Sequence, residues 1–444
     1  MSKKKATPPK IAKPSRVVTC VYGVLLIALA GIPVCVTELF DKGEDKWFLI
    51  RCIGPILAIV LGLHASGKPL KSRSLDPLAL CAVAWVGVQV LSLLDAHNTG
   101  LGLTVITRQI GLLGFFFTAR YFALDANTNR FMPILYILVV IGFATSVYGT
   151  FQHFGHDFID WQINSEVPID RGVSFMGHAT FAAAALIMVL PIALALALST
   201  KSKNIKVLLV GASVLMLYHL SFSGARVATV ALFLSIGTAL AVAQRVWVRA
   251  TTEDSPMDPA AFRRKVAGAF LVCLVLGGAF AYRAWQLKGS DLLGLSEGGM
   301  AQRLYAWETA NRMFLANPFN GVGVGHYEMI SPDYWGVIES SRFVQFGRML
   351  YQPHNDYLEA AAEMGLPGIT CLLALVSFAL IQSIALVSRH RVLAVGLFTA
   401  VLASSLDAFF IFSWQIPSTA LIFWVILGII SGLYNRPDEE SADV

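Results

Sequence analysis

The sequence has little charge: only 14% of its 444 residues are Asp, Glu, Lys or Arg, whereas 56% are hydrophobic. This polar fraction is too small to cover the surface of a water-soluble globule, so a soluble fold is excluded. The apolar runs also lack the alternation of apolar and polar residues that membrane barrel strands need. We therefore predict an all-α integral membrane protein, because helices satisfy their own backbone hydrogen bonds in lipid.

The sequence also lacks clear metal-binding motifs. Its six cysteines lie in or at the edge of apolar runs without CxxC spacing, so neither a zinc site nor a disulfide scaffold is indicated. No paired-acid DxD motif lies in a segment predicted to face outward. His153, His156, Asp157 and Asp160 resemble a ligand spacing, but short His/Asp clusters in external loops are usually just solvated. We expect no metal and no cofactor.

Twelve apolar segments are long enough to cross a hydrocarbon core of about 30 Å. They span residues 17–36, 48–63, 75–94, 103–122, 131–152, 175–198, 205–221, 225–243, 266–285, 367–387, 392–411 and 416–433. The first follows a basic N-terminal segment but carries no small-residue cleavage pattern, so we expect a retained helix rather than a cleaved signal.

The distribution of Lys and Arg predicts that both tails lie in the cytoplasm. If the N-terminus is inside, the inward loops and tails carry most of these residues, whereas the short outward loops carry only Lys42, Lys46 and Arg171. The net charge of +6 is therefore interpreted as membrane topology rather than as affinity for nucleic acid.

The same topology predicts the domain organisation. Residues 1–285 would hold the first nine helices and residues 367–433 the last three, followed by a short cytoplasmic tail at 434–444. Residues 286–366 would form one large outward loop with amphipathic helices, much longer than an ordinary connection.

Ionisable side chains in or beside the predicted spanning segments all fall on the outer face. Such groups are costly in a membrane and tend to be functional. They are Arg51, Arg108, His178, His219, Arg226 and Asp407, together with Arg303 and His354 in the large loop. Arg51 and Arg108 could equally extend to lipid head groups, whereas Arg226 follows a short hairpin that holds it against the bundle.

The segment QPHNDYLEAAAEMG predicts a helix with Gln352 near its cap, Pro353 at its first position and its end at Gly365. His354 would then lie in the first turn, where the helix dipole disfavours imidazolium. A neutral histidine can accept a proton as a general base. Taken alone, the pattern also fits a surface histidine on a short interfacial helix.

A second amphipathic helix is predicted in MAQRLYAWETANRMFLANP. Met300, Leu304, Trp307 and Phe314 recur there at helical spacing, and Arg303 lies at the border of this apolar stripe. The NGVGVG that follows lacks the Lys-Ser/Thr of a nucleotide-binding loop.

Together these residues resemble the O-antigen ligases of Gram-negative bacteria, over nearly the whole chain. The matching features are Arg226 opening a helix, Arg303 in the large loop and Asp407 late in the penultimate helix. The most specific feature is the His-Asn-x-x-Leu pattern with a following glycine, here His354, Asn355, Leu358 and Gly365.

The resemblance implies a GT-C type glycosyltransferase of the bacterial inner membrane, with its active site facing the periplasm. Its expected partners are an undecaprenyl diphosphate-linked glycan donor, a lipid A-core acceptor and membrane lipids, without nucleic acid. In such a site His354 would be the general base, and Arg226 and Arg303 would hold the diphosphate. Further substrate-binding residues are expected at Arg171, His178, Asn355, Asp407 and Arg108.

Other functions remain open from the sequence. O-antigen polymerases and protein O-oligosaccharyltransferases share the histidine pattern, but the latter often carry extra sequence after the last helix, so the short tail favours a ligase. A lipid or glycan transporter is a different class of function. Transporters usually place charges near the midplane, whereas here the charges cluster near one face.

Overall fold

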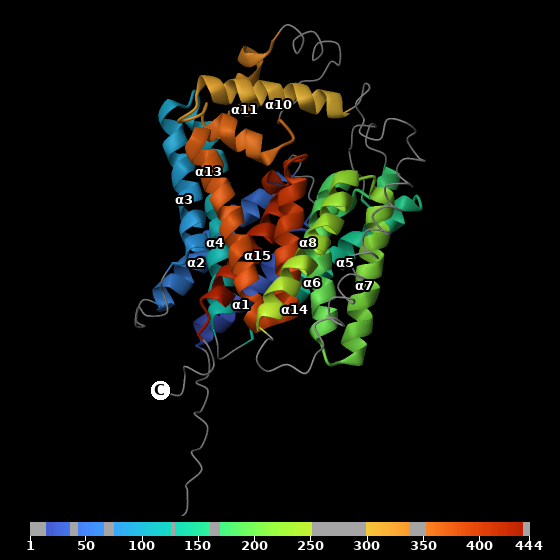
Figure 1. Ribbon diagram of the computed structural model, residues 1–444. Coiled ribbons are helices and arrows are strands. Elements are labelled where there is room, and N and C mark those ends of the chain that lie inside the picture. Colours follow the sequence, from blue (N-terminus) through green and yellow to red (C-terminus); the bar gives the residue numbers. More distant parts are fainter. Residues whose placement is uncertain are drawn as a thin grey trace, which may run out of the picture.

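The computed structural model describes residues 15–35, 43–65, 75–125, 129–159, 169–250, 299–336 and 352–437. Within these residues the chain is a bundle of helices without strands (Figure 1). Ten of the described helices are long and apolar enough to cross a membrane. The prediction of an all-α integral membrane protein is confirmed.

The helices of the bundle follow the predicted segments closely. The first six are α1 (Arg16–Gly31), α2 (Glu44–Ala65), α3 (Pro77–Leu91), α4 (Thr99–Leu124), α5 (Phe131–His153) and α6 (Ala179–Ser199). The others are α7 (Lys203–Ser223), α8 (Arg226–Ala250), α13 (Asp356–Ala385), α14 (Val387–Asp407) and α15 (Pro417–Tyr434). Helix α1, with 16 residues, is shorter than the ten candidate spans. The predicted ninth segment, 266–285, lies outside the described residues.

Small residues set the close packing of the central helices. Helix α15, the most enclosed of the described spans, packs on α4, and α2 packs on the same helix. A Cβ added to Gly428 of α15 would collide with the carbonyl oxygen of Phe116 in α4, and one added to Gly54 of α2 with that of Gly111. Lipid gives apolar side chains little reason to associate, so such close backbone contact is what holds membrane helices together.

Residues 299–336 lie across one end of the bundle (Figure 1). They contain α10 (Gly299–Ala316), α11 (Tyr327–Ile330) and the short 3-10 helix η5 (Ser331–Tyr334). Helix α10 packs on α13, so the amphipathic helix predicted around Arg303 is confirmed in position.

The predicted apolar stripe of α10 is confirmed only in part, since the Trp307 ring lies 5.7 Å from that of Phe410 and Phe314 is half-buried. Leu304 is 45% exposed, and the face buried on the bundle is instead made of Ala306, Thr309, Ala310 and Met313. These mostly small side chains let α10 approach α13 closely, where Ala310 and Met313 pack with Tyr327 and Ala362. Helical spacing showed an amphipathic helix, but side-chain size decided which face is buried.

Helix α13 is broken at Gly365, where φ is +62° and ψ is −155°. The predicted helix end at this glycine is confirmed, although a new helical segment follows directly. The backbone amides of Val322 and Gly323 donate to the carbonyls of Ala362 and Glu363 at 3.1 and 2.9 Å. The NGVGVG loop therefore satisfies carbonyl groups that the break leaves without helical partners.

Candidate active site

His354 lies just before α13 rather than inside its first turn. The side chain of Asn355 caps the helix by accepting hydrogen bonds from the amides of Tyr357 and Leu358, both at 3.0 Å. The predicted start, with Gln352 near the cap and Pro353 at the first position, is wrong because Asn355 satisfies these free amides. His354 has φ +53°, which is uncommon for a non-glycine residue and costly enough to be found mainly at functional sites.

A row of aromatic rings connects His354 to a second histidine. The His354 ring lies 4.8 Å from that of Phe412, which lies 5.3 Å from Phe181, and Phe181 lies 5.3 Å from His178. His178 is the N-cap of α6, where its Nδ1 accepts from the amide of Thr180 at 3.2 Å. The two histidines therefore border one site.

Three arginines from different elements surround this site. Arg303 belongs to α10, Arg171 to the 3-10 helix η3 (Ile169–Arg171), and Arg226 opens α8. Arg303 interacts electrostatically with both His354 and His178, and Arg171 interacts with His178. Arg226 in turn interacts with Arg171. The fold thus brings together residues that are far apart in the sequence.

Both histidines are neutral near pH 7. Burial lowers the pKa of His354 to about 3, assisted by the positive charges of Arg303 and His178. Burial also lowers the pKa of His178 to about 4, with contributions from Arg171 and Arg303. A neutral His354 was predicted from the helix dipole, but desolvation and neighbouring cations are the physical cause.

Arg171 packs over the turn between α7 and α8. Its Nε donates to the carbonyl of Ser223 at 2.8 Å, and Gly224, with φ +68°, leaves room for the guanidinium. A Cβ at Gly224 would lie 2.8 Å from an Arg171 nitrogen. Burial lowers the pKa of Arg171, yet an arginine of this kind stays charged at any physiological pH. The turn therefore fixes one cation beside Arg226.

Asp407 lies at the end of α14 and is 3% exposed. Its carboxylate interacts electrostatically with Arg303, opposing the lowering of the Arg303 pKa that burial causes. Its Oδ2 has no hydrogen-bond partner in the part of the chain that the structure describes. Asp407 therefore lies beside Arg303, and its predicted role in substrate binding stays a prediction.

Arg108 belongs to a different group of side chains. It pairs with Glu44, which also pairs with Arg51 at 3.2 Å, and its guanidinium lies 5.3 Å from the centre of the Trp47 ring. This group joins α2 to α4. The predicted role of Arg108 in substrate binding stays a prediction, at a place other than the arginines around His354.

Two other histidines from the sequence have structural partners. His219 is fully buried, and its Nε2 lies 2.9 Å from the carbonyl oxygen of Gly172. His153 stacks on Phe222 at 4.1 Å, with its Nδ1 at 2.6 Å from the carbonyl oxygen of Asp170. Across the described ranges, no group of three or more His, Cys, Asp or Glu side chains could hold a metal ion, and Asp160 lies outside them.

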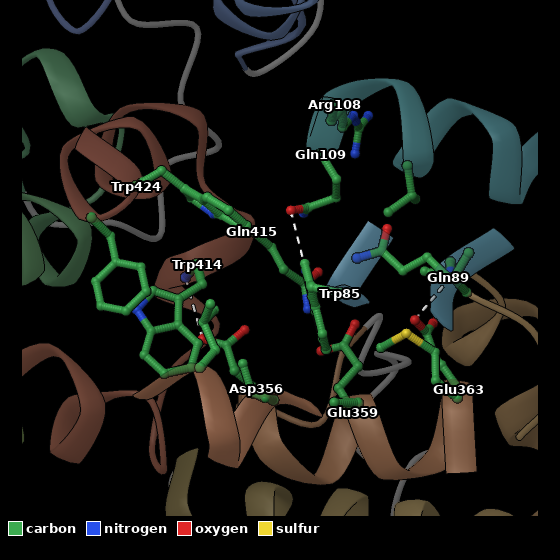
Figure 2. A pocket seen from close by; sticks show the side chains of 18 of the residues that line it. Trp85, Gln89, Arg108, Gln109, Asp356, Glu359, Glu363, Trp414, Gln415 and Trp424 are labelled. Carbon is green, nitrogen blue, oxygen red and sulfur yellow. Dashed lines mark hydrogen bonds between the residues drawn. The ribbon is translucent and has the colours of Figure 1, made fainter. Parts of the chain in front are cut away.

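Three acidic residues of α13, which were not predicted as site residues from the sequence, also lie here. Asp356, Glu359 and Glu363 are each 5% exposed and line a cavity of about 100 Å³ beside the segment that carries His354 (Figure 2). Their spacing in DYLEAAAE places them on one face of a helix, which could have been read from the sequence. The cavity is also lined by Trp47, Trp85, Trp414, Trp424, Gln89, Gln109 and Gln415.

Comparison with family models supports the predicted resemblance. Residues 211–373 match the model of the family described as O-antigen ligase. The predicted resemblance is confirmed over this segment, which contains Arg226, Arg303 and His354, whereas its extent over nearly the whole chain and the roles of these residues stay predictions. Comparison with curated proteins gave no match. The match supports a membrane enzyme of the ligase and polymerase type.

Proposed function

We propose that the protein is an O-antigen ligase, which transfers a glycan from undecaprenyl diphosphate to a sugar hydroxyl of lipid A-core at the periplasmic face of the bacterial inner membrane. The observation that carries this proposal is His354. It is neutral and half-buried, its buried Nδ1 has no hydrogen-bond partner among the described residues, and it lies beside Arg303.

The arginines supply the charge that a diphosphate donor needs. Departure of the lipid diphosphate leaves extra negative charge, and planar guanidinium groups bind phosphate oxygens in pairs without losing their own charge. Arg171 and Arg226 lie together at the α7–α8 turn, while Arg303 approaches from α10. We assign Arg226 and Arg303 to the two ends of the diphosphate, with Asp407 holding Arg303 in position.

His354 supplies the base for the attacking hydroxyl, a weak nucleophile. The acceptor oxygen attacks the anomeric carbon from the side opposite the diphosphate, and its proton passes to the Nδ1 of His354. The bond between the anomeric carbon and the diphosphate oxygen breaks, and undecaprenyl diphosphate leaves with the electron pair. This direct displacement inverts the anomeric carbon, and the arginines rather than a metal ion balance the leaving charge.

The donor also activates the base. In the free enzyme the positive charge of Arg303 helps to keep the pKa of His354 low. A bound diphosphate offsets this charge, so the pKa of His354 rises toward its ordinary value. A base whose pKa lies closer to the working pH transfers protons more effectively, so the site becomes competent when the donor is bound.

The test combines purified protein, lipid-diphosphate glycan and lipid A-core in a chelator-containing buffer without ATP. We expect glycan joined to lipid A-core, with a rate that EDTA leaves nearly unchanged. A polymerase would lengthen the donor glycan instead, and a transporter would leave both lipids unaltered. Loss of transfer in EDTA with recovery on adding Mg²⁺ would contradict the metal-independent mechanism.

A further inference from the structure

We propose that the cavity beside α13 is a subsite for one sugar residue of the acceptor, in which Glu359 and Gln89 form hydrogen bonds with its hydroxyl groups. This inference rests on the proposed glycosyl transfer and adds a place where the acceptor is recognised. Figure 2 shows Glu359 on α13 and Gln89 on α3 lining the same space.

Two buried oxygen atoms of the cavity are without partners. Glu359 is 5% exposed and Gln89 only 1%, yet Glu359 Oε2 and Gln89 Oε1 accept no hydrogen bond from any described residue. Leaving a buried polar group unsatisfied costs about 1–3 kcal/mol. A sugar hydroxyl can donate to Gln89 Oε1 and can either donate to or accept from the Glu359 carboxyl, so it would satisfy both atoms.

The other two acidic residues already have partners. Glu363 accepts from the amides of Gly325 and Tyr327, both at 2.8 Å, and Asp356 accepts from the amide of Trp414 at 3.2 Å. These two carboxyl groups therefore hold the loop around Gly325 and the turn around Trp414 in place. The Glu359 carboxyl also contacts the Gln415 side chain, so its Oε2 and Gln89 Oε1 are the atoms left to face a ligand.

The lining combines hydrogen-bond acceptors with aromatic rings, and this combination fits a sugar. A pyranose offers hydroxyl donors around its edge and an apolar surface of C–H groups on its faces. Indole rings of Trp47, Trp85, Trp414 and Trp424 supply apolar surface, and the amides of Gln109 and Gln415 add polar groups. A lipid chain would leave the buried oxygens unsatisfied.

The size of the cavity limits what it can hold. An apolar cavity of about 150 Å³ accommodates benzene, so a cavity of about 100 Å³ accepts one edge of a single sugar ring rather than a chain. Arg108 and Trp85, both only partly buried, also line it, so the cavity is not sealed by the protein core. The remainder of the glycan would extend outward.

The position of the cavity assigns it to the acceptor rather than the donor. Gln415, on its wall, accepts from Gln352 at 2.6 Å, and Asp356 follows His354 by two residues, so the cavity adjoins the segment that carries the base. The arginine pair at the α7–α8 turn lies toward α6, α7 and α8, whereas the cavity is formed by α2, α3, α4, α13 and α15 (Figure 1). The two flanks of His354 thus hold different substrates.

Binding of the acceptor glycan can be measured without any reaction. The purified protein is titrated with delipidated core oligosaccharide in the absence of donor, and the intrinsic tryptophan fluorescence, to which the four cavity tryptophans contribute, is recorded. We expect a saturable change for the wild type and at least about tenfold weaker binding for Glu359→Gln and for Gln89→Leu, since each variant alters one hydrogen bond to the sugar. Thermal unfolding checks that each variant is folded.

The matched control is Glu308→Gln. Glu308 is exposed on α10 and pairs with Arg312 at 3.2 Å, so the same chemical change is made away from the cavity. Binding by this variant should equal that of the wild type. Wild-type affinity in both cavity variants, or no binding by the wild type, would overturn the proposal and mean that the cavity holds only water.

The results also separate this inference from the proposed function. If His354→Ala abolishes transfer while Glu359→Gln keeps the wild-type KM for acceptor, the subsite is wrong and the ligase assignment stands. If the oligosaccharide binds through Glu359 but no glycan is transferred to lipid A-core, the subsite stands and the ligase assignment fails.

Discussion

Two polar clusters at opposite ends of the bundle differ in how the groups at their centres are paired, although Gln382 Oε1 in the first of them also has no hydrogen-bond partner among the described residues. At one end, Asp76 caps α3 and its carboxylate is surrounded by donors. These are Arg120 at 3.4 Å, Gln382 and Asn435 at 2.7 Å, and Ser431 at 2.6 Å. At the other end, His354 Nδ1, Asp407 Oδ2 and Glu359 Oε2 have no hydrogen-bond partner among the described residues.

Helix α13 connects these clusters, since Asp356 near its start follows His354 by two residues and Gln382 near its end donates to Asp76. A polar cluster that serves the fold must be satisfied by the protein, because burying an unpaired polar group is costly. A cluster that binds a ligand must keep hydrogen-bonding atoms free for that ligand. The comparison therefore assigns stability to the Asp76 end and chemistry to the His354 end.

The largest effect is expected for His354→Ala. Removing the general base should reduce glycan transfer by about 10²-fold or more, while the midpoint of thermal unfolding stays near the wild-type value. His97→Ala, at an exposed histidine near the same end, is the matched control and should retain full activity. Wild-type turnover by the His354 variant would remove the general base from the mechanism.

Substitutions of Arg303 distinguish the contribution of its positive charge from that of its planar guanidinium geometry. Arg303→Ala should lower transfer by about 10²-fold, because a group that stabilises leaving charge is lost. Arg303→Lys should be less impaired but clearly below wild type, since lysine keeps the charge without the planar fork. Initial rates at varied donor and acceptor concentrations should place the defect with the lipid-diphosphate donor.

Arg312, on the same helix and ion-paired with Glu308, provides the control for that comparison. Arg312→Ala and Arg312→Lys should both transfer glycan at the wild-type rate. An Arg303→Ala enzyme that uses donor normally would show that this arginine is only a head-group anchor, and the diphosphate site would then be sought at Arg171 or Arg108.

Substitution of Asp76 tests whether the cluster around it stabilises the fold rather than supporting glycan transfer. Asp76→Ala leaves Arg120, which is 7% exposed, without its carboxylate and should reduce the free energy of unfolding by about 3–5 kcal/mol. Transfer per folded molecule should remain unchanged. Asp95→Ala, at an exposed residue, should alter neither quantity, and a slower but equally stable Asp76 variant would contradict the division between the two ends.

The smallest effect is a shift in pH dependence. A base works when deprotonated, so a pKa of about 3 for His354 in the free enzyme keeps kcat/KM for donor constant as pH falls below 6.5. The bound diphosphate raises this pKa, so the acid limb of kcat should lie about one pH unit or more above that of kcat/KM. Coincident limbs near pH 6.5 would show that the surroundings of His354 do not control its protonation.

Local features of the sequence predicted much of the fold and part of the site. Apolar runs predicted the helices because burial in lipid demands length and hydrophobicity. Gly365 predicted the break in α13, since its backbone adopts positive φ. The sequence around Asn355 also contains the signal for the helix cap and for the acidic face of α13. The prediction instead used Pro353 as the first helical residue, which placed the start of the helix about one turn too early.

The sequence by itself therefore determined a membrane bundle, because hydrophobic length is a property of short segments. The prediction that the ionisable side chains of the spans all lie at one end is wrong, because Asp76 and Arg120 are buried and paired at the other end. Only the tertiary structure decided that Arg303 lowers the pKa of His354, that Arg108 pairs with Glu44, and that Glu359 and Gln89 face one cavity. These relations join helices far apart in the chain. Burial and long-range pairing depend on which helices pack together, and the local periodicity of the sequence does not specify this packing.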